Sequence, residues 1–161
     1  MRTSPSAHKA TLDSGAIGIE IDLSELTQIA NDLEEAIQSP GIEIMELVGE
    51  DIVDGIQEEF ETAGRGRWPP LAESTLARRR GSIAQILVDT GVMRGSIDQD
   101  AIRAGEASVQ VGTEVEYAVY HVSDGPRSKI PKRDFYDIAD LYLQRAEETL
   151  LDGILQKAGF K

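Results

Sequence analysis

A regular helical pattern runs from residue 42 to residue 61. Apolar side chains recur there every three or four positions, at Ile42, Met45, Val48, Ile52, Ile56 and Phe60. This spacing places them on one face of an α-helix. Such a face has to be buried against other elements, so the rest of the chain must supply a core around this helix.

Carboxylates occupy the positions between the apolar residues of this helix, at Glu43, Glu46, Glu50, Asp54 and Glu58. The acidic face has two interpretations. It is either an ordinary solvated face or a docking surface for another subunit, and the solvated face is the favoured interpretation.

The negative charge of the chain lies in its first third. Residues 1–61 hold 15 acidic and two basic side chains, residues 62–161 hold 14 of each, and the net charge is −13. An acidic surface repels nucleic acid, and it either suits a basic protein partner or keeps the chain soluble. Solubility is the favoured explanation.

The length of 161 residues and a hydrophobic content of 40% predict one folded domain over residues 16–161, after a flexible arm over residues 1–15. Cysteine is absent, which excludes disulfides and thiolate metal sites. A zinc site built on His8 or His121 would need carboxylates as further ligands. We expect no metal and no cofactor.

Neither a secretory signal nor a membrane span is expected. The first 15 residues are polar, no apolar h-region follows them, and no apolar run approaches the roughly 18 residues of a transmembrane helix. We therefore expect the protein in the cytoplasm or in a particle assembled there.

Two elements are predicted ahead of residue 42. Residues 17–23 alternate between aliphatic and polar or small side chains, which predicts a half-buried strand. Ser24 is the expected N-cap of a helix that ends at Pro40-Gly41.

Short elements and loops are predicted after residue 61. Glycines at 64 and 66 end the long helix, and residues 68–71 are expected to be extended because two prolines follow Trp68. Ser74 or Thr75 is the expected cap of a short basic helix through Arg80. Asp89-Thr90 is the expected cap of a helical turn that carries Met93 and Arg94.

The remaining pattern predicts a β-hairpin, a loop and a last helix. The hairpin arms are residues 97–104 and 107–112, joined by a Gly105-Glu106 turn. Residues 117–121 follow as a further ordered segment of this β region, residues 123–131 are a loop, and residues 137–157 form a helix. The predicted fold class is α+β, a small antiparallel sheet packed with two or three longer helices and extended loops.

No catalytic motif is present. The chain has no P-loop, no dinucleotide-binding glycine pattern, no H-E-x-x-H and no G-x-S-x-G. A hydrolase built on His121 with Asp89 or Asp124 and with Ser96 or Ser123 is a formal alternative, but any chain of this size offers such a set by chance. We expect a protein that is not an enzyme.

The Arg78-Arg79-Arg80 run is the one candidate contact to nucleic acid. Three arginines in one helical turn splay over more than about 100° of surface, and no aromatic residues interleave with them. Pairing with an acidic surface, such as residues 43–61 of a neighbouring copy, is the favoured interpretation. Trp68 either caps the core from its loop or anchors an interface.

The order of several motifs resembles the phage virion morphogenesis family. They are W-P-P-L-x-x-x-T-L-A-R-R from Trp68, I-L-V-D-T-G-x-M-R-x-S-I from Ile86, V-x-V-G-T-x-V-x-Y-A-x-Y-H from Val109 and I-P-x-R-x-F from Ile130. The resemblance covers about residues 42–138. Two features depart from it: the glycine-rich stretch of many relatives is reduced to Gly125, and residues 17–37 have no counterpart in the family pattern.

The resemblance implies a structural protein that acts in tail completion and head–tail joining of a tailed bacteriophage, as in Mu-like phages. It implies a subunit of a homo-oligomeric ring at the neck or tail end of the virion, assembled in the cytoplasm of the host bacterium. The expected partners are other copies and neighbouring neck, connector or tail-tube proteins, without a membrane and with only incidental nucleic-acid contact in the channel. The alternative is an assembly module that contacts nucleic acid through the basic cluster of residues 65–80.

Two sets of residues follow from these patterns. The candidates for subunit contacts are Arg65, Arg67, Trp68, Pro69, Leu71, Arg78, Arg79, Arg80, Asp89, Thr90, Arg94, Arg127, Lys129 and Arg133. The structural residues of the family motifs are Gly91, Ser96, Ile97, Gly112, Tyr117, His121, Pro131 and Phe135.

Overall fold

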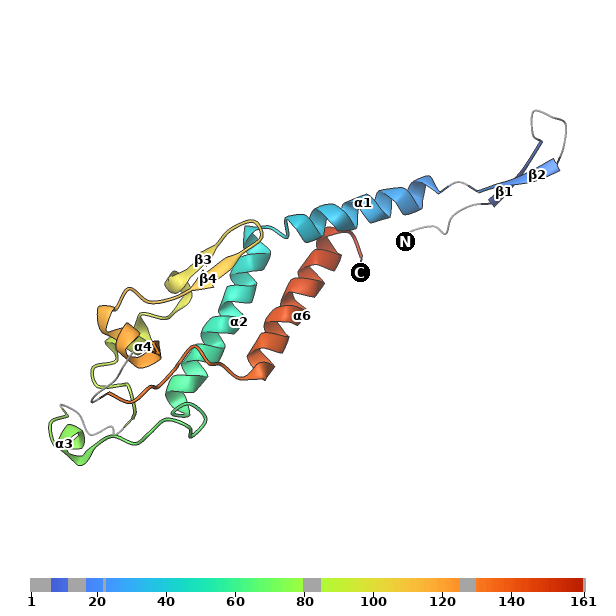
Figure 1. Cartoon of the computed structure of the whole chain (residues 1–161). Coiled ribbons are helices and arrows are strands. Elements are labelled where there is room, and N and C mark those ends of the chain that lie inside the picture. Colours follow the sequence, from blue (N-terminus) through green and yellow to red (C-terminus); the bar gives the residue numbers. More distant parts are fainter. Residues whose placement is uncertain (1–6, 12–16, 22, 80–84, 125–129, 161) are drawn as a thin grey trace.

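The chain folds around one central helix, α2 (Ile42–Glu61), as the computed structural model in Figure 1 shows. The structure describes residues 7–11, 17–21, 23–79, 85–124 and 130–160. A hairpin of β3 (Ile102–Ala104) and β4 (Val109–Val111) packs on one side of α2, and α6 (Asp140–Lys157) packs on the other. These helices and strands confirm the predicted α+β class.

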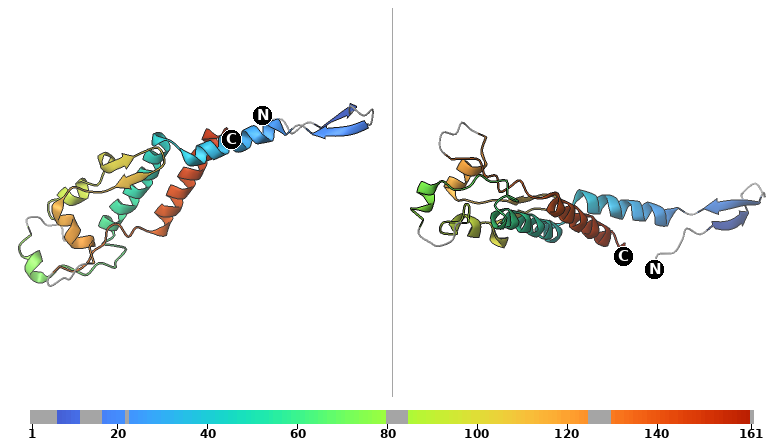
Figure 2. Two further views of the ribbon diagram at one scale, coloured as in Figure 1. Left: turned by 45° about the horizontal axis from the view of Figure 1, so that its top comes forward. Right: turned by 90° about the horizontal axis from the view of Figure 1, so that it is seen from below.

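The molecule is elongated, and its two ends are different. The antiparallel pair of β1 (Ala7–Thr11) and β2 (Ile17–Ile21), followed by α1 (Ser24–Gln38), projects from one end. The short helices α3 (Glu73–Leu76), α4 (Val92–Gly95) and α5 (Val119–Val122) lie at the other end. Both views in Figure 2 keep this separation.

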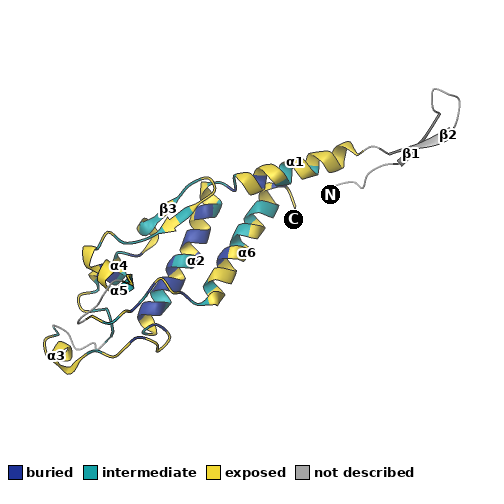
Figure 3. Ribbon diagram, viewed as in Figure 1, coloured by how far each residue is buried: buried dark blue, intermediate teal, exposed yellow. Residues whose placement is uncertain are grey.

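The apolar face predicted for α2 forms the core. Met45, Val48, Ile56 and Phe60 are buried, whereas Ile42, in the first position of the helix, is exposed. Figure 3 shows the buried residues concentrated on α2. The ring of Phe60 stacks on Phe135 with centroids 5.1 Å apart and meets Trp68 edge-on at 6.0 Å. The aromatic residues of two distant motifs thus meet at the C-terminal end of this helix.

A buried carboxylate on α2 fixes the position of α6. Asp51 forms an ion pair with Arg145, with Nη2 and Oδ1 2.7 Å apart. It also accepts a 2.6 Å hydrogen bond from the Thr149 hydroxyl. The helix α6 starts three residues later than predicted, because Ala139 is extended (φ −66°, ψ 144°) and Ile138 packs into the core ahead of the helix.

The β3–β4 hairpin is shorter than predicted. Its register pairs Ile102 with Val111 and Ala104 with Val109. Residues 97–101 are not a strand, because Ile97 is fully buried in the core and the side chain of Asp98 caps a 3-10 turn over Gln99–Ala101. The Gly105 N–H donates to the Ser108 carbonyl at 2.8 Å, so the turn is centred one residue later than expected.

The N-terminal part holds two elements that were predicted and one that was not. β2 confirms the strand predicted from alternation at residues 17–23, and its partner β1 lies in a stretch where no element was predicted. α1 confirms the predicted helix, but its N-cap position is Leu23 and not Ser24.

The predicted caps of both short helices were wrong, and α3 ends at Leu76, ahead of the arginine run that it was expected to carry. Ser74 and Thr75 lie inside α3, whose N-cap is Ala72. Gly91 is the N-cap of α4, with a φ of 80° that favours glycine, so neither Asp89 nor Thr90 occupies that position. The 117–121 segment is helical, as η2 (Glu116–Ala118) followed by α5, and not a β segment.

Candidate functional site

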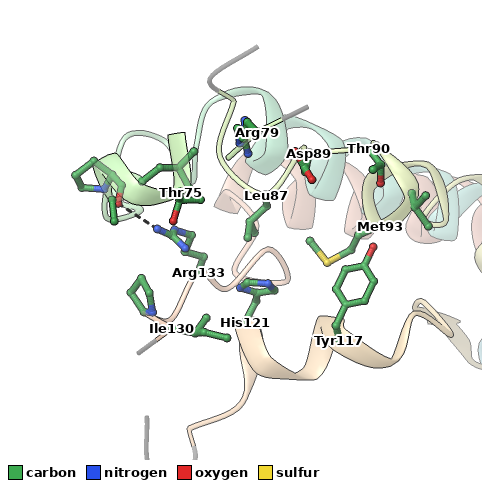
Figure 4. A pocket seen from close by; sticks show the side chains of 16 residues that line it. Thr75, Arg79, Leu87, Asp89, Thr90, Met93, Tyr117, His121, Ile130 and Arg133 are labelled. Carbon is green, nitrogen blue, oxygen red and sulfur yellow. Dashed lines mark hydrogen bonds between the residues drawn. The ribbon is translucent and has the colours of Figure 1, made fainter. Parts of the chain in front are cut away.

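A cleft of about 650 Å³ opens at the end of the molecule that carries α3, α4 and α5. Segments from four separate parts of the chain form it, and Figure 4 shows their side chains around a shared space. The residues that line it are Pro70, Leu71, Ala72, Thr75, Arg79, Leu87, Asp89, Thr90, Gly91, Val92, Met93, Tyr117, His121, Ile130, Pro131 and Arg133. The family-like motifs therefore converge on one surface.

Arg133 fixes one wall of the cleft. Its guanidinium is buried and donates to the Pro69 carbonyl from Nε at 3.1 Å and from Nη2 at 2.9 Å, and to the Pro70 carbonyl at 3.2 Å. Burial lowers the pKa of Arg133 from its ordinary value. Two prolines and a forked donor hold this loop, which limits the conformational entropy that the wall can lose on binding.

The floor of the cleft is continuous with the core. Met93 is buried, and Leu87 packs against the same cluster with a left-handed φ of 61°. That conformation costs a residue with a side chain roughly 1–2 kcal/mol, which the apolar packing of Leu87 offsets. Figure 4 shows Leu87 and Met93 facing the cleft from one side and Tyr117 and His121 facing it from the other.

The rim of the cleft exposes large apolar side chains. Val92, Tyr117 and Ile130 have 56%, 46% and 44% of their surfaces exposed. Arg79 and Asp89 add charge to the lining. Exposed apolar side chains gathered at a concave surface are typical of a protein-binding site.

The cleft does not assemble the formal Ser/His/Asp set. His121 and Asp89 line it, but neither Ser96 nor Ser123 does. The Ser96 hydroxyl lies 2.8 Å from the Met93 carbonyl and 2.5 Å from the Thr113 hydroxyl. Over the ranges that the structure describes, no group of three or more possible metal-ligating side chains gathers either.

Arg65 and Arg67 belong to a separate charged group, the Glu59 cluster (Glu59, Arg65, Arg67 and Asp137). Glu59 is 1% exposed and pairs with both arginines, with Arg67 Nη2 at 3.1 Å. Arg67 also pairs with Asp137, and the Asp137 carbonyl accepts from both guanidiniums at 3.1 Å. Two arginines face two carboxylates, so the cluster presents no net positive charge to a phosphate backbone.

The pKa values of the Glu59 cluster move in opposite directions. Burial raises the pKa of Glu59, and the guanidiniums of Arg65 and Arg67 oppose that rise. The hydrogen bond from Arg67 lowers the pKa of Asp137. The same bond raises the pKa of Arg67.

Arg94 ties the D-T-G turn to α2. Its guanidinium forms an ion pair with Glu61 at 2.6 Å, and its Nε donates to the side-chain oxygen of Gln57 at 2.8 Å. The Gln57 amide in turn donates to the backbone carbonyls of Arg94 and Ile97. Arg65, Arg67 and Arg94, which were candidates for subunit contacts, thus contact carboxylates of their own chain.

Apart from Arg65, Arg67 and Arg94, the predicted site residues fall into four groups. Leu71, Arg79, Asp89, Thr90, Arg133, Gly91, Tyr117, His121 and Pro131 line the cleft. Trp68, Ile97 and Phe135 are buried in the core, so the burial of Trp68 fits a core cap. Pro69 and Arg78 are exposed, and Ser96 and Gly112 are half-buried near the hairpin. Arg80, Arg127 and Lys129 lie outside the described residues.

Several residues of these sites were not predicted. Glu59 and Asp137 organise the basic loop, and Val92 and Ile130 form the apolar rim. The R-G-R sequence directly after a carboxylate-rich helix end was an available signal for the Glu59 cluster. Nothing in the local pattern of Val92 or Ile130 marked either residue as part of a rim.

No helix of the described ranges has both the length and the apolar character needed to cross a bilayer. No curated protein and no solved structure matches the chain. The model of the phage virion morphogenesis family matches residues 21–154, a longer stretch than the motifs alone cover, and it includes α1, for which no family counterpart was expected. The chain belongs to the phage virion morphogenesis family, and its role is in the assembly of a phage virion.

Proposed function

We propose that this protein is a structural component of the neck or tail end of a tailed bacteriophage. It acts in tail completion and head–tail joining, as a subunit of a homo-oligomeric ring, and it has no enzymatic activity. Its place is the virion, which is assembled in the cytoplasm of the host bacterium. Its partners are other copies of itself and the neighbouring neck, connector or tail-tube proteins.

The observation that carries this proposal is the convergence of the family-like motifs on one open, apolar-rimmed cleft. Four segments that span residues 70–133 contribute to it. A surface of this kind recognises a protein segment through shape and apolar contact. The ordered wall at Arg133 and the two prolines lowers the entropy cost of binding there.

The proposal is tested by removing the protein from assembling particles. Lysates of a phage that lacks a functional copy should contain DNA-filled heads and separate tails under the electron microscope, and supplying the protein in trans should restore joined particles. Particles with normally joined tails in the absence of the protein would contradict the proposal.

A further inference from the structure

The helix α1 exposes an apolar face that the described part of its own chain leaves uncovered. Its C-terminal part packs on the body, where Ala36 is buried. Leu26 has 46% of its surface exposed and Ala30 is exposed, while Ile29 and Leu33 are half-buried. Figure 3 shows α1 mostly exposed as it leaves the body. A helix of 15 residues is marginal in water on its own, so it needs a partner.

The exposed face of α1 has the spacing of a helix that docks in a groove. Leu26, Ile29, Ala30 and Leu33 occupy positions i, i+3, i+4 and i+7. Helices bound in apolar grooves use these four positions as anchors. The cleft at the other end of the molecule provides such a groove, with Leu71, Leu87 and Met93 inside and Val92 and Ile130 at the rim.

The charges of the two surfaces are complementary. α1 carries four acidic side chains and no basic one. The cleft lining carries two arginines, Arg79 and Arg133, against one carboxylate, Asp89, and the exposed Arg78 is adjacent in sequence. An acidic helix is therefore attracted to this groove and repelled by the acidic face of α2.

The occupant must come from another molecule. α1 projects from the end of the chain that lies opposite the cleft, and its packing on α6 holds it there (Figures 1 and 2). A contact between unlike surfaces of identical chains is heterologous, and it closes into a ring when its rotation permits.

We propose that α1 of one copy docks in the cleft of the next copy, with Leu26, Ile29 and Leu33 as its anchors. This inference rests on the proposed ring function and names the contact that builds the ring. The cleft is completed by side chains of the adjacent subunit, and each copy contributes one helix and one cleft.

The chain contains no cysteine, which allows a direct test by engineered disulfides. The test compares a Leu26→Cys/Ile130→Cys double variant, oxidised in solution and in assembled particles, with the two single variants. The double variant should give a ladder beyond the dimer on a non-reducing gel, and an equal mixture of the single variants should give only dimers. A Leu26→Cys/Leu47→Cys double variant is the matched control, because Leu47 is also an exposed leucine but lies on α2; it should give no ladder.

Charge variants test the direction of the contact without a covalent bond. Leu26→Glu and Ile130→Glu should each abolish self-association in analytical ultracentrifugation, since both side chains are exposed and neither change disturbs the core. Mixing the two should restore a dimer and nothing larger, because one intact helix and one intact cleft remain per pair. Leu47→Glu should associate as the unaltered chain does.

Three results would overturn the inference. One is a dimer formed by Leu26→Cys alone, which would indicate pairing between two copies of α1. Another is self-association that persists in Ile130→Glu. The third is an absence of cross-links both in solution and in particles. If particles without cross-links still have joined tails, the proposed contact between α1 and the cleft is wrong while the proposed function stands. Joined tails in particles that lack the protein would instead refute the function.

Discussion

Arg133 is the residue on which the shape of the cleft depends most directly. A buried guanidinium is stable only where carbonyls satisfy its donors, and here Pro69 and Pro70 supply them from more than 60 residues earlier in the chain. The sequence marked Arg133 as a surface contact, because nothing local shows that a distant proline loop will cover it.

Arg133→Lys should destabilise the protein and loosen the wall of the cleft. Lysine keeps the charge but cannot donate to both proline carbonyls in the same fork. We expect the free energy of unfolding in urea to fall by about 1.5–3 kcal/mol, the range for hydrogen bonds to charged groups. Arg103→Lys is the control, since Arg103 is exposed on β3, and it should stay within about 0.5 kcal/mol of the unaltered protein. An equal effect of both changes would contradict this role.

Asp137 makes part of the stability dependent on pH. Its pKa is lower in the folded chain than in the unfolded chain, because Arg67 hydrogen-bonds to it. Its contribution is therefore complete above the unfolded pKa and is lost as pH falls through the folded pKa. Glu59 affects the pH dependence of stability in the opposite direction, because burial raises its pKa.

Asp137→Asn should flatten the acid limb of the stability profile. Urea unfolding between about pH 5 and pH 2 should show a shallower loss of stability in this variant than in the unaltered chain, since one of the two carboxylates that pair with Arg67 is gone. The effect is small because the carboxylate is exposed. Asp152→Asn is the control, because Asp152 is exposed on α6 and lies outside the Glu59 cluster. An unchanged slope in Asp137→Asn would show that the ion pair contributes nothing.

At the scale of elements, α2 depends on close approach as much as on its apolar face. A Cβ at Gly49 would lie 2.6 Å from Cγ2 of Ile102 and 3.1 Å from Cγ2 of Val109. Glycine at this position lets the β3–β4 hairpin pack directly on the helix backbone. The contact joins the central helix to the sheet.

Gly49→Ala should destabilise the protein, although alanine favours a helix over glycine by about 1 kcal/mol. The added methyl group must displace Ile102, and overpacking of this kind costs about 1–3 kcal/mol. Gly95→Ala in α4 is the matched control, since a Cβ at Gly95 would meet no atom of the described residues within 4 Å. Thermal unfolding should show a lower Tm for Gly49→Ala only; a raised Tm would refute the close-packing account.

The sequence predicted the long elements better than the short ones. The helices α1 and α2 could be predicted because their apolar periodicity extends over many residues. A pattern of that length still predicts a helix when one of its apolar positions, such as Ile42, turns out to be exposed. The β prediction for residues 97–101 failed because burial of Ile97 and the Asp98 cap outweighed β propensity over a few positions. Most cleft residues were named in advance, but their convergence depends on tertiary contacts that no local pattern records.

At the scale of the whole molecule, the two ends have complementary properties. One end presents an acidic helix with an exposed apolar face, and the other presents an apolar cleft with arginines in its lining. A contact between such unlike ends of identical chains would be heterologous, the kind that closes into a ring when its rotation permits. The distribution of charge along the sequence, acidic first and balanced afterwards, is consistent with this polarity.

The position of the protein in an intact particle tests the proposed function most directly. A reconstruction of complete virions by electron cryomicroscopy should show a closed ring of this chain at the junction between head and tail, one ring per particle. Copies distributed along the tail tube, located only inside the head, or missing from complete virions would contradict a role in the neck or tail end.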